Sequence, residues 1–399
     1  MSKKYIILTP GIANMGGSEM FTYNKWKYLT SHGWDVDIFF FNKGEHFCLK
    51  ELEKYKNNCI PDLIYGISFL SSRRKKDILD RILSNVTQND EIVVESHLYS
   101  LTLWGEMIVE RMGGRSIVNC MEENIDQISL AEAEFMEFKL KRHEILNASV
   151  KSLHRYFGQC YKDEYEKYTH SYMRAYCSNV VTRTVKAEIE IKKADFNILS
   201  IGRLEKPYVL PTFAEVRKFV DLHHDKFFNI IVIGGDPKGD VEGKIRTVFN
   251  GVKNVYFLFL GYMFPVPSNL IEINNVAIAS ANSVLVPSNE GVPTIAIDIH
   301  DNLPIGIYGR TTNNKFSRDS EPATSIVELL DDVLIKGLYP KSNPILRNEK
   351  AEMEEVFGKQ LDFLKLSSSD GTAYPVEELY SVWRVLYDRT KYYLHKLGL

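Results

Sequence analysis

The sequence predicts an α/β protein with two doubly wound, mainly parallel sheets, and three observations support this prediction. Short apolar runs typical of buried strands alternate with segments whose apolar residues recur at helical spacing. This alternation stops in a polar stretch at residues 186–195 and then begins again. The chain has 399 residues, which is enough for two domains of about 100–200 residues each.

The first half of the chain opens with a continuous apolar run at residues 5–8, as expected of a strand buried on both faces. A helix is expected at residues 18–32, and Gly33 is suited to end it. The other elements expected in this half are strands at 35–41, 91–95 and 116–120 and helices at 101–112 and over most of 127–170.

The second half repeats the same alternation. It contains one expected helix at residues 212–222 and a final helix at residues 375–399. Its expected strands lie at residues 196–201, 229–233, 254–260, 283–287, 294–297 and 305–308. Strands that alternate with helices in this way favour a parallel sheet in each half.

Composition and charge exclude several classes of protein. Hydrophobic residues make up 44% of the chain and charged residues 25%, which rules out a disordered or collagen-like chain. The net charge of -3 argues against sequence-independent binding of nucleic acid. The five cysteines form no C-x-x-C pair, so a reducing cytosol is expected rather than a disulfide framework or a zinc site. Because no apolar run approaches the roughly 18 residues of a membrane span, we expect a cytoplasmic protein, or one on the inner face of a membrane.

A glycine-rich loop follows the first expected strand and contains Gly16 and Gly17. Glycines let the backbone turn tightly, and the helix that follows offers free N–H groups to an anion. The loop is not G-x-G-x-x-G, so a dinucleotide-dependent dehydrogenase is poorly supported. An ordinary strand–helix turn capped by Ser18 is the alternative interpretation.

Two cations, Arg203 and Lys206, come directly after the strand expected at residues 196–201. Ligands of open α/β sheets lie at the carboxyl ends of strands. Two cations there could bind a diphosphate and stabilise it as a leaving group, although a solvated basic loop is the alternative. Two acids eight positions apart, Glu290 and Asp298, could accept hydrogen bonds from sugar and ribose hydroxyls. The alternative for them is an acid in the first turn of a helix.

In their order and location these motifs resemble the retaining glycosyltransferases of family 4, which have the GT-B fold. The segments that carry the resemblance are residues 16–19, ILSIGRLEK at 198–206, NIIVIGG at 229–235, VYFLFLGY at 255–262 and PSNEGVPTIAID at 287–298. The resemblance covers most of the chain and implies two Rossmann-like domains, residues 1–190 and 191–374, facing each other across a cleft. The C-terminal helix at 375–399 is expected to return to the N-terminal domain.

The resemblance also implies roles for individual residues. Gly16 and Gly17 would approach the donor phosphates and the acceptor, and Arg203 with Lys206 would bind the diphosphate. Glu290 and Asp298 would contact the donor sugar and the nucleotide ribose. His97 would lie near the reacting centre, and Tyr262 or Met263 would lie near the base. The backbone of four further residues would face the sugar or phosphates: Gly291, Val292, Pro293 and Thr294. A loop histidine with satisfied hydrogen bonds is the alternative for His97.

The implied activity is transfer of a hexose or related sugar from a nucleoside diphosphate, expected to be UDP, to a hydroxyl acceptor with retention. The acceptor would be a glycan, a lipid-linked molecule or a protein, in surface polysaccharide or glycoprotein assembly. No D-x-D metal motif is apparent in the segments that carry the resemblance, so cationic side chains rather than a metal would stabilise the departing diphosphate. No cofactor beyond the donor is expected, and a partner glycosyltransferase or a homo-oligomer is left open.

Two departures from the family pattern keep other functions open. The family's lysine stands five residues after its arginine, where this sequence has Tyr208, and the second acid is an aspartate. These departures motivate the alternative of a non-catalytic GT-B subunit that supports a partner transferase. A GT-B nucleotide-sugar 2-epimerase is a further alternative.

A basic run at residues 71–76 opens an amphipathic helical pattern that contains Ile78 and Ile82. Such a segment could lie against anionic lipid, in a peripheral contact with the membrane. The alternative, which we favour from the sequence, is a solvated helix with a basic loop. Glu122 and Glu123 could face an acceptor hydroxyl, and ordinary loop acids are the alternative for both.

Overall fold

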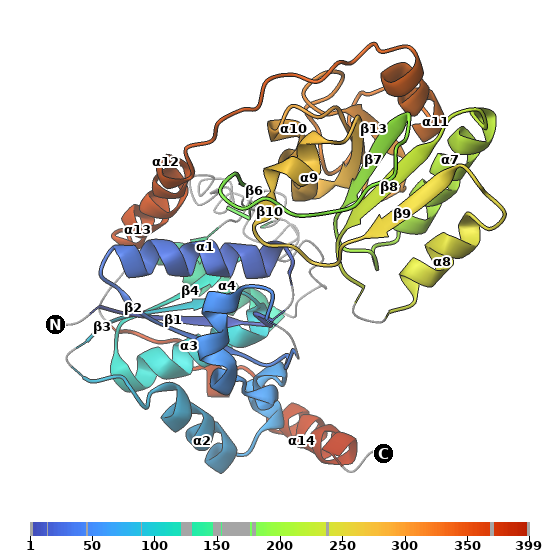
Figure 1. Cartoon of the computed structure of the whole chain (residues 1–399). Helices are drawn as coiled ribbons and strands as arrows, with labels where there is room; N and C mark the ends of the chain where they lie inside the picture. Colours follow the sequence, from blue (N-terminus) through green and yellow to red (C-terminus); the bar gives the residue numbers. More distant parts are fainter. Residues whose placement is uncertain are drawn as a thin grey trace. The chain divides into compact units, whose positions relative to one another are not determined.

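The structure is a computed structural model, and the chain divides into two compact units (Figure 1). Unit 1 contains Met1–Tyr176 together with Asn348–Leu399, and unit 2 contains Cys177–Arg347. The residues that the structure describes are 3–13, 15–44, 47–88, 90–120, 130–146, 153, 176–177, 181–236, 239–367 and 371–396.

Unit 1 contains a parallel sheet of five strands in the order β2-β1-β3-β4-β5. Its strands are β1 (Lys3–Thr9), β2 (Asp35–Phe40), β3 (Glu91–Ser96), β4 (Arg115–Asn119) and β5 (Ile145–Leu146). The α-helices described in its first segment are α1 (Gly17–Ser31), α2 (Ser72–Ile82), α3 (Tyr99–Met112) and α4 (Leu130–Lys141). Three 3-10 helices precede α2: η1 (Lys50–Asn58), η2 (Pro61–Ile64) and η3 (Ile67–Phe69).

Helices cover the sheet of unit 1 on both faces because neighbouring residues of its strands are apolar. In β1, Ile6 and Leu8 are fully buried in a cluster that contains side chains of α2 and α3. The neighbouring residue Tyr5 points to the opposite face of the sheet. There its ring lies under Lys25 of α1, whose Nζ is 5.3 Å from the ring centroid. Figure 1 shows α1 on one face of the sheet and α3 on the other. This is the doubly wound arrangement that the apolar run at residues 5–8 predicts.

The last part of the chain packs within unit 1. Gln360 accepts a hydrogen bond from Lys25 Nζ at 2.8 Å, and Glu354 accepts one from the hydroxyl of Tyr28 at 3.1 Å. Residues 348–374, which the sequence analysis assigns to the second domain, therefore contact α1. The elements of this segment are α12 (Glu349–Met353), the π-helix η7 (Glu354–Gly358), α13 (Lys359–Leu364), the 3-10 helix η8 (Val376–Glu378) and α14 (Val382–Lys396).

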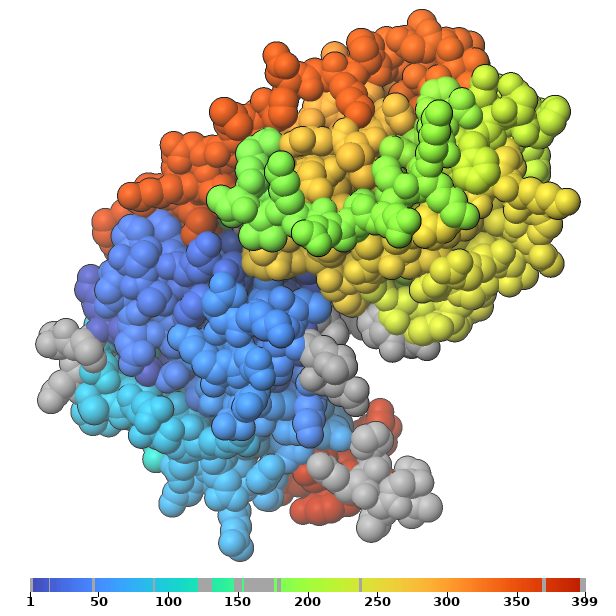
Figure 2. Space-filling model, in the orientation of Figure 1, coloured from blue at the N-terminus to red at the C-terminus, as the bar shows by residue number. Residues whose placement is uncertain are grey.

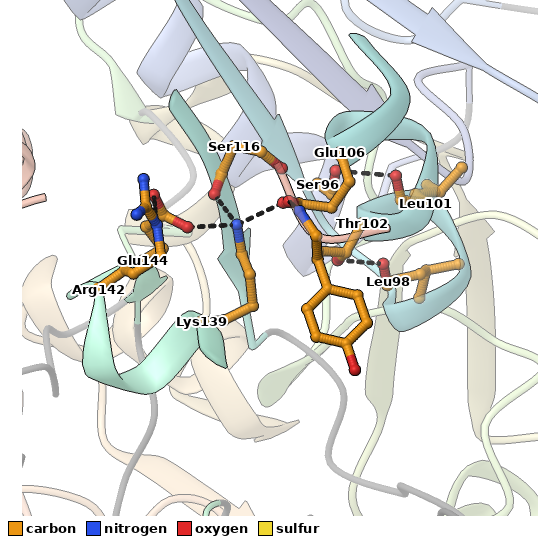
Figure 3. A network of polar contacts seen from close by, with 10 residues as sticks. Ser96, Leu98, Leu101, Thr102, Glu106, Ser116, Lys139, Arg142 and Glu144 are labelled. Atoms are coloured by element: carbon orange, nitrogen blue, oxygen red, sulfur yellow. Dashed lines mark hydrogen bonds and ion pairs between the residues drawn. The ribbon is translucent and has the colours of Figure 1, made fainter. Parts of the chain in front are cut away.

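A buried ionic cluster links this returning segment to the sheet of unit 1 (Figure 3). Lys139 of α4 donates hydrogen bonds at 2.6 Å to Glu106 of α3 and at 2.6 Å to Glu144. It also contacts the carbonyl oxygen of Ser116 in β4. The second carboxylate oxygen of Glu106 accepts the backbone N–H of Tyr374 at 2.9 Å. Burial raises the pKa of Glu144 against the opposing charge of Lys139. A buried charge without its partner is costly, so this cluster fixes the position of the chain near Tyr374.

Unit 2 contains a six-stranded sheet in the order β13-β12-β11-β7-β8-β9, in which all pairs are parallel except β12 with β13. Its strands are β7 (Phe196–Ile201), β8 (Phe228–Ile233), β9 (Val255–Phe259), β11 (Val276–Ser280), β12 (Thr294–Ile297) and β13 (Pro304–Ile307). A separate two-residue pairing joins β6 (Val181–Thr182) to β10 (Val266–Pro267). Its helices are α7 (Val209–Leu222), α8 (Val241–Val248), α9 (Ser268–Glu272), η5 (Ala281–Val284), α10 (Leu285–Asn289), α11 (Ile326–Leu330) and the π-helix η6 (Asp331–Ile335).

The sheet of unit 2 is also buried on both faces. Ile230 and Val232 of β8 lie in one apolar cluster with residues of α7, α8 and α11. Ile231 and Ile233 lie in a second cluster with residues of α9 and α10. The continuous apolar sequence of β8 therefore supplies both faces, as expected of a central parallel strand.

One expected strand is wrong. Residues 283–287 do not form a strand, because they lie in η5 and α10. The strand between β9 and β12 in the sequence is β11 (Val276–Ser280), which the sequence analysis omits. The two runs have similar apolar composition, but β11 pairs with β7 and β12 on both sides. A proline such as Pro287 has no backbone N–H and is rarely found inside a central strand.

The expected helix at 127–170 is described only in part, as α4, because most of its remaining residues lie outside the described part of the chain. Glu122 and Glu123 also lie outside it. The final helix, α14, begins at Val382 and not at 375. In the described part of the chain, no helix combines the length and apolar character that crossing a membrane requires.

Candidate functional site

The candidate site lies where the parallel strands of unit 2 end, an edge of the sheet that we call the carboxyl edge. Strands β7, β8, β9, β11 and β12 all run in the same direction, so the loops after them meet at this edge. The residues that follow these strands include Gly202 and Arg203, Gly234 and Gly235, Tyr262 and Met263, Asn282 and Ser283, and Asp298.

Close backbone packing joins the first three of these loops. The N–H of Gly202 donates to the carbonyl oxygen of Ile233 at 3.0 Å, and the N–H of Gly234 donates to that of Gly261 at 2.8 Å. A Cβ atom on Gly234 would lie 1.7 Å from the oxygen of Gly202, and Gly234 has φ 156°. A Cβ atom on Gly235 would lie 1.8 Å from the ring of Tyr262. Only glycine therefore fits at these two positions without movement of a neighbour.

Arg203 is the cation that this loop packing positions most directly. It follows Gly202 at the end of β7, and its side chain is 39% exposed while it pairs with Glu205 at 3.4 Å. Lys206 is exposed on the same loop, one turn before α7, and its carbonyl oxygen accepts the N–H of Val209 at 3.1 Å. The structure therefore brings both predicted cations to one loop at the carboxyl edge.

Tyr208 occupies the position at which the resembling family has its lysine. Burial raises the pKa of its hydroxyl to about 12, so the side chain is a neutral phenol at ordinary pH. A Cβ atom on Gly202 would lie 3.0 Å from the hydroxyl oxygen of Tyr208, which shows how closely the phenol packs against the start of the loop. The residue five positions after Arg203 therefore carries no positive charge. Tyr208 instead packs against the loop that carries Arg203 and supports it.

A segment that the sequence analysis did not consider, residues 315–318, also runs along the carboxyl edge. The carbonyl oxygens of Lys315 and Phe316 accept the N–H groups of Ala281 at 2.8 Å and Ile299 at 3.0 Å. The Nζ of Lys315 donates to Asn282 at 2.8 Å, just after β11. Strand β11 pairs with β7, and Arg203 follows β7. Lys315 therefore places a further cation at the end of the strand next to β7.

Asp298 directly follows β12 and therefore lies at the carboxyl edge. Its Oδ1 accepts the N–H of His300 and its Oδ2 accepts the N–H of Arg318, both at 2.8 Å. The side chain is buried and holds residues 315–318 against the sheet. Its clearest contribution is thus to order this edge, and the predicted contact with a ribose stays a prediction.

Glu290 does not lie with Arg203, which corrects the predicted arrangement. Helix α10 lies in the sequence between the parallel strands β11 and β12, so it starts near the carboxyl edge and ends near the opposite, amino edge. Glu290 follows the last residue of α10, and its carboxylate pairs with Arg183. Arg183 also contacts Glu272 at 3.0 Å. Burial raises the pKa of Glu290, while the charge of Arg183 acts in the opposite direction. The side chain is part of an ion cluster remote from the Arg203 loop along the sheet.

The four residues after Glu290 also lie at the amino edge. The carbonyl oxygen of Pro293 accepts the N–H of Ala277, which is near the start of β11, at 2.8 Å. The carbonyl oxygen of Gly291 accepts the N–H of Ser342 at 2.9 Å. Val292 and Thr294 are buried. The predicted role of these four residues, with a backbone that faces sugar or phosphates at the Arg203 loop, is therefore not supported, because Gly291, Val292 and Pro293 precede β12 and Thr294 is its first residue.

Tyr262 and Met263 follow β9, so they lie at the carboxyl edge. The ring of Tyr262 packs against Gly235, and Met263 packs partly buried against the apolar cluster that contains Ile233. A contact between either side chain and a base stays a prediction.

In unit 1, Gly16 lies between β1 and α1, where the sequence predicts a tight turn, and Gly17 is the first residue of α1. Gly16 precedes the first residue of α1 in an extended conformation, and its carbonyl oxygen accepts the N–H of Met20 at 3.0 Å. No side chain caps this helix start at Gly16. Their predicted approach to donor and acceptor stays a prediction.

His97 is buried in a polar network around Glu95 at the end of β3. Its Nε2 lies 3.0 Å from Glu95 Oε1 and its Nδ1 lies 3.1 Å from the hydroxyl oxygen of Thr9. A carboxylate only accepts, so Nε2 carries a proton. Asn119 also donates to Oε1 at 3.0 Å, and Lys25 contacts Oε2. With both ring nitrogens engaged and 2% of the residue exposed, His97 has the contacts expected of a satisfied histidine, and its predicted place near a reacting centre stays a prediction.

In the described part of the chain, no three His, Cys, Asp or Glu side chains are grouped so that they could hold a metal ion.

Comparisons with known proteins identify the fold. No family model matches this sequence, and no curated protein matches it. Anabaena Alr3699/HepE, crystallised with UDP and glucose, matches over 100% of both chains with a TM-score of 0.50 and 10% identity. A glycosyltransferase from Rickettsia africae ESF-5 matches over 99% of both chains with a TM-score of 0.49 and 13% identity. The lipopolysaccharide outer core galactosyltransferase WaaB matches over 98% of this chain and 99% of its own with a TM-score of 0.47 and 14% identity.

At these identities the likeness shows the fold alone. The chain has the GT-B type of α/β fold that the sequence predicts, built from two units that each contain a parallel sheet.

Proposed function

We propose that this protein is a glycosyltransferase that moves a sugar from a nucleoside diphosphate to a hydroxyl acceptor. The observation that carries the proposal is Arg203, which lies on a glycine-packed loop at the carboxyl edge of the unit 2 sheet. Open α/β sheets bind their ligands at this edge. A partly exposed guanidinium there suits a diphosphate, because its planar group of donors can bind phosphate oxygens in pairs.

The reaction requires stabilisation of a leaving diphosphate. The acceptor oxygen forms a bond to the anomeric carbon, and the bond from that carbon to the phosphate oxygen breaks. The electron pair stays with the diphosphate, and the proton of the acceptor passes to the departing phosphate oxygen. Negative charge therefore grows on the diphosphate, where Arg203, Lys206 and Lys315 would stabilise it more in the transition state than before it.

A UDP-sugar is the donor that we propose. Support comes from the Anabaena protein of the same fold, which was crystallised with UDP and glucose. Retention at the anomeric carbon, transfer of a hexose or related sugar, and independence from metal follow only from the resemblance in sequence motifs and are proposed with it. The proposed acceptor is a glycan, a lipid-linked molecule or a protein, in the assembly of a surface polysaccharide or glycoprotein.

A thermal-shift panel with UDP-, GDP- and ADP-sugars tests the proposal, followed by assay of sugar release or transfer. A ligand at 100 times its Kd adds about 2.7 kcal/mol to the free energy of unfolding. We expect a rise in Tm with one class of nucleotide, and slow release of sugar with the same class. The variant Lys244→Ala serves as a control for substitution of a surface lysine, because Lys244 pairs with Asp240 on the surface of α8. It should show the same nucleotide-dependent rise in Tm as the unmodified chain. No shift with any of the three classes would contradict the proposal.

A second candidate, a non-catalytic subunit that binds nucleotide sugars, is favoured by one specific observation. Two charged groups expected from the family pattern are missing from the carboxyl edge, because Glu290 lies at the amino edge and a neutral phenol, Tyr208, stands at the lysine position. Nucleotide-dependent rises in Tm without release or transfer of sugar, under conditions that include glycan acceptors, would favour this candidate.

A further inference from the structure

The last helix, α14, has its apolar side turned outward. Six large apolar or aromatic side chains on it are between 44% and 82% exposed: Val382, Trp383, Leu386, Tyr387, Tyr393 and Leu394. They recur at helical spacing, in the adjacent rows 382, 386, 393 and 383, 387, 394, so they form one continuous face. We call this set of six residues the outer face of α14. Red atoms of this part of the chain are visible at the surface in Figure 2.

The opposite side of α14 contacts the rest of unit 1 mainly through polar groups. Asp388 is 1% exposed and accepts a hydrogen bond from the hydroxyl of Ser68 at 2.7 Å. Arg389 donates to the carbonyl oxygen of Leu70 at 3.5 Å, and the ring of Tyr392 packs edge-on against Tyr65 at 4.9 Å. A surface helix of a globular protein normally buries its apolar side and exposes its polar side. Here the arrangement is reversed, and the polar contacts fix the orientation.

Basic residues surround the outer face. Between Val382 and Leu394 the helix carries three cations, Arg384, Arg389 and Lys391, and a single acid, Asp388, which is buried and paired with Arg384. The basic start of α2 lies next to α14. Asp62 accepts a hydrogen bond from Arg74 of α2 at 2.7 Å and one from Tyr392 of α14 at 3.5 Å. Two further cations of α2, Arg73 and Lys76, are exposed.

We propose that the outer face of α14 and the basic start of α2 form a surface that binds an anionic lipid bilayer. Aromatic and aliphatic side chains beside cations are the composition of helices that lie in the lipid headgroup region. Tryptophan and tyrosine favour this region because one end of the ring system is apolar and the other polar. Cations near the bilayer are attracted by anionic headgroups. This inference goes beyond the transferase proposal and does not depend on it.

The charge of the surface favours lipid over a second copy of the chain. A two-fold dimer places the same patch of both chains in contact. Pairing through α14 would bring Lys391 and the nearby cations of one copy toward those of the other. An anionic bilayer supplies the opposite charge and an apolar phase together.

Flotation with vesicles tests the proposal on the full chain. Vesicles of phosphatidylcholine alone are compared with vesicles that contain about one third phosphatidylglycerol, at low and moderate salt. We expect the chain to float with the anionic vesicles, and less at higher salt because exposed charges are then screened. The triple variant Trp383→Ser, Leu386→Ser, Tyr387→Ser should bind roughly tenfold less or weaker still. Leu346→Ser, at an equally exposed apolar residue (82%) of unit 2, is the matched control and should bind like the unmodified chain.

Tryptophan fluorescence provides a second readout that does not depend on the triple variant. Of the four tryptophans, Trp104 and Trp34 are buried and Trp26 is half-buried, whereas Trp383 is 82% exposed. Anionic vesicles should therefore shift the emission to shorter wavelength in the unmodified chain. The shift should be absent in Trp383→Phe, which keeps an aromatic ring and should still float.

Three results would overturn the inference: no flotation with anionic vesicles, equal flotation of the triple variant, or a dimer in light scattering that the triple variant abolishes. Nucleotide-induced changes in Tm are measured without vesicles. Failure of lipid binding is therefore distinguishable from failure of the proposed transferase activity.

Discussion

At the level of single residues, Lys315 tests whether the proposed site includes more cations than Arg203. Lys315 is the further cation at the carboxyl edge, where its Nζ contacts Asn282 after β11. Hydrogen bonds to charged groups contribute about 1.5–3 kcal/mol. We therefore predict that Lys315→Met weakens the binding of UDP roughly tenfold or more in isothermal titration.

The loss should be specific to the diphosphate, so uridine without phosphates serves as the comparison ligand. Lys336→Met is the control variant, since Lys336 pairs with Asp331 and Asp332 away from this edge. Equal loss of uridine and UDP binding, or no loss at all, would remove Lys315 from the site.

The residues that sequence reasoning placed correctly are those that directly follow a strand. Arg203, Tyr262 and Asp298 each come within three residues of a strand end, so a local pattern is enough to predict the edge on which they lie. The local pattern misplaces Glu290 because it predicts a strand at residues 283–287, shortly before this residue, where the structure has η5 and α10. Lys315 had no such signal, because it reaches the end of β11 from 35 residues further along the chain through contacts with Ala281 and Asn282.

The loops after β8 and β9 pack so closely at the carboxyl edge that one added methyl group should destabilise the fold. A Cβ atom at position 235 would lie 1.8 Å from the ring of Tyr262. We predict that Gly235→Ala lowers the free energy of unfolding by about 1–3 kcal/mol, as overpacking usually does. The quantity is measured by urea denaturation.

Removal of the ring tests the cause of that loss. Adding Tyr262→Ala to Gly235→Ala should relieve the overlap, so the two substitutions together should cost less than the sum of their separate effects. Gly243→Ala in α8 is the matched control because nothing lies within 4 Å of its Cβ, and it should stabilise the chain by up to about 1 kcal/mol. Simple additivity of the two substitutions would contradict the packing that we describe.

The network around Glu95 links three elements of unit 1: β3, α1 and α13. Lys25 contacts both Glu95 and Gln360. We predict that Glu95→Gln lowers the free energy of unfolding by about 3–5 kcal/mol, because it leaves Lys25 buried without a countercharge. Adding Lys25→Met should recover part of the loss. If the double variant is as unstable as Glu95→Gln alone, the ion pair is not the cause.

The same network predicts a dependence of stability on pH. Although burial acts to raise the pKa of Glu95, Lys25 and His97 together hold it well below its ordinary value of 4.5. The folded state therefore favours the ionised form, which adds stability above pH 4.5, and this stability is lost as the pH falls below that value. In acid titration followed by urea denaturation, the unmodified chain should lose stability below about pH 4.5 more steeply than the Glu95→Gln variant. Equal slopes would contradict this assignment.

At the scale of elements, strand prediction succeeded wherever an apolar run was flanked by clear turns, as for β1, β7 and β8. It failed for β11, since two apolar runs, 276–280 and 283–287, compete for the same place in the sheet. Pairing with β7 and β12 selects the first run, and such pairing is not visible in a local pattern.

The whole molecule has the fold that the alternating pattern predicts, with two units that each contain a mainly parallel sheet covered on both faces. The return of the chain to unit 1 depends on contacts between residues more than 260 positions apart, such as Tyr374 with Glu106. No local pattern reports contacts of this kind. The reversed orientation of α14 is likewise a property of its tertiary contacts through Asp388.

Titration calorimetry with UDP tests the central claim most directly, when the unmodified chain is compared with Arg203→Ala and Glu290→Gln. Because Arg203 lies at the carboxyl edge and Glu290 at the amino edge, we predict that Arg203→Ala weakens UDP binding roughly tenfold or more. Glu290→Gln should leave the affinity essentially unchanged. An unmodified chain that binds none of UDP, GDP and ADP, or a Glu290→Gln variant as impaired as Arg203→Ala, would contradict the account.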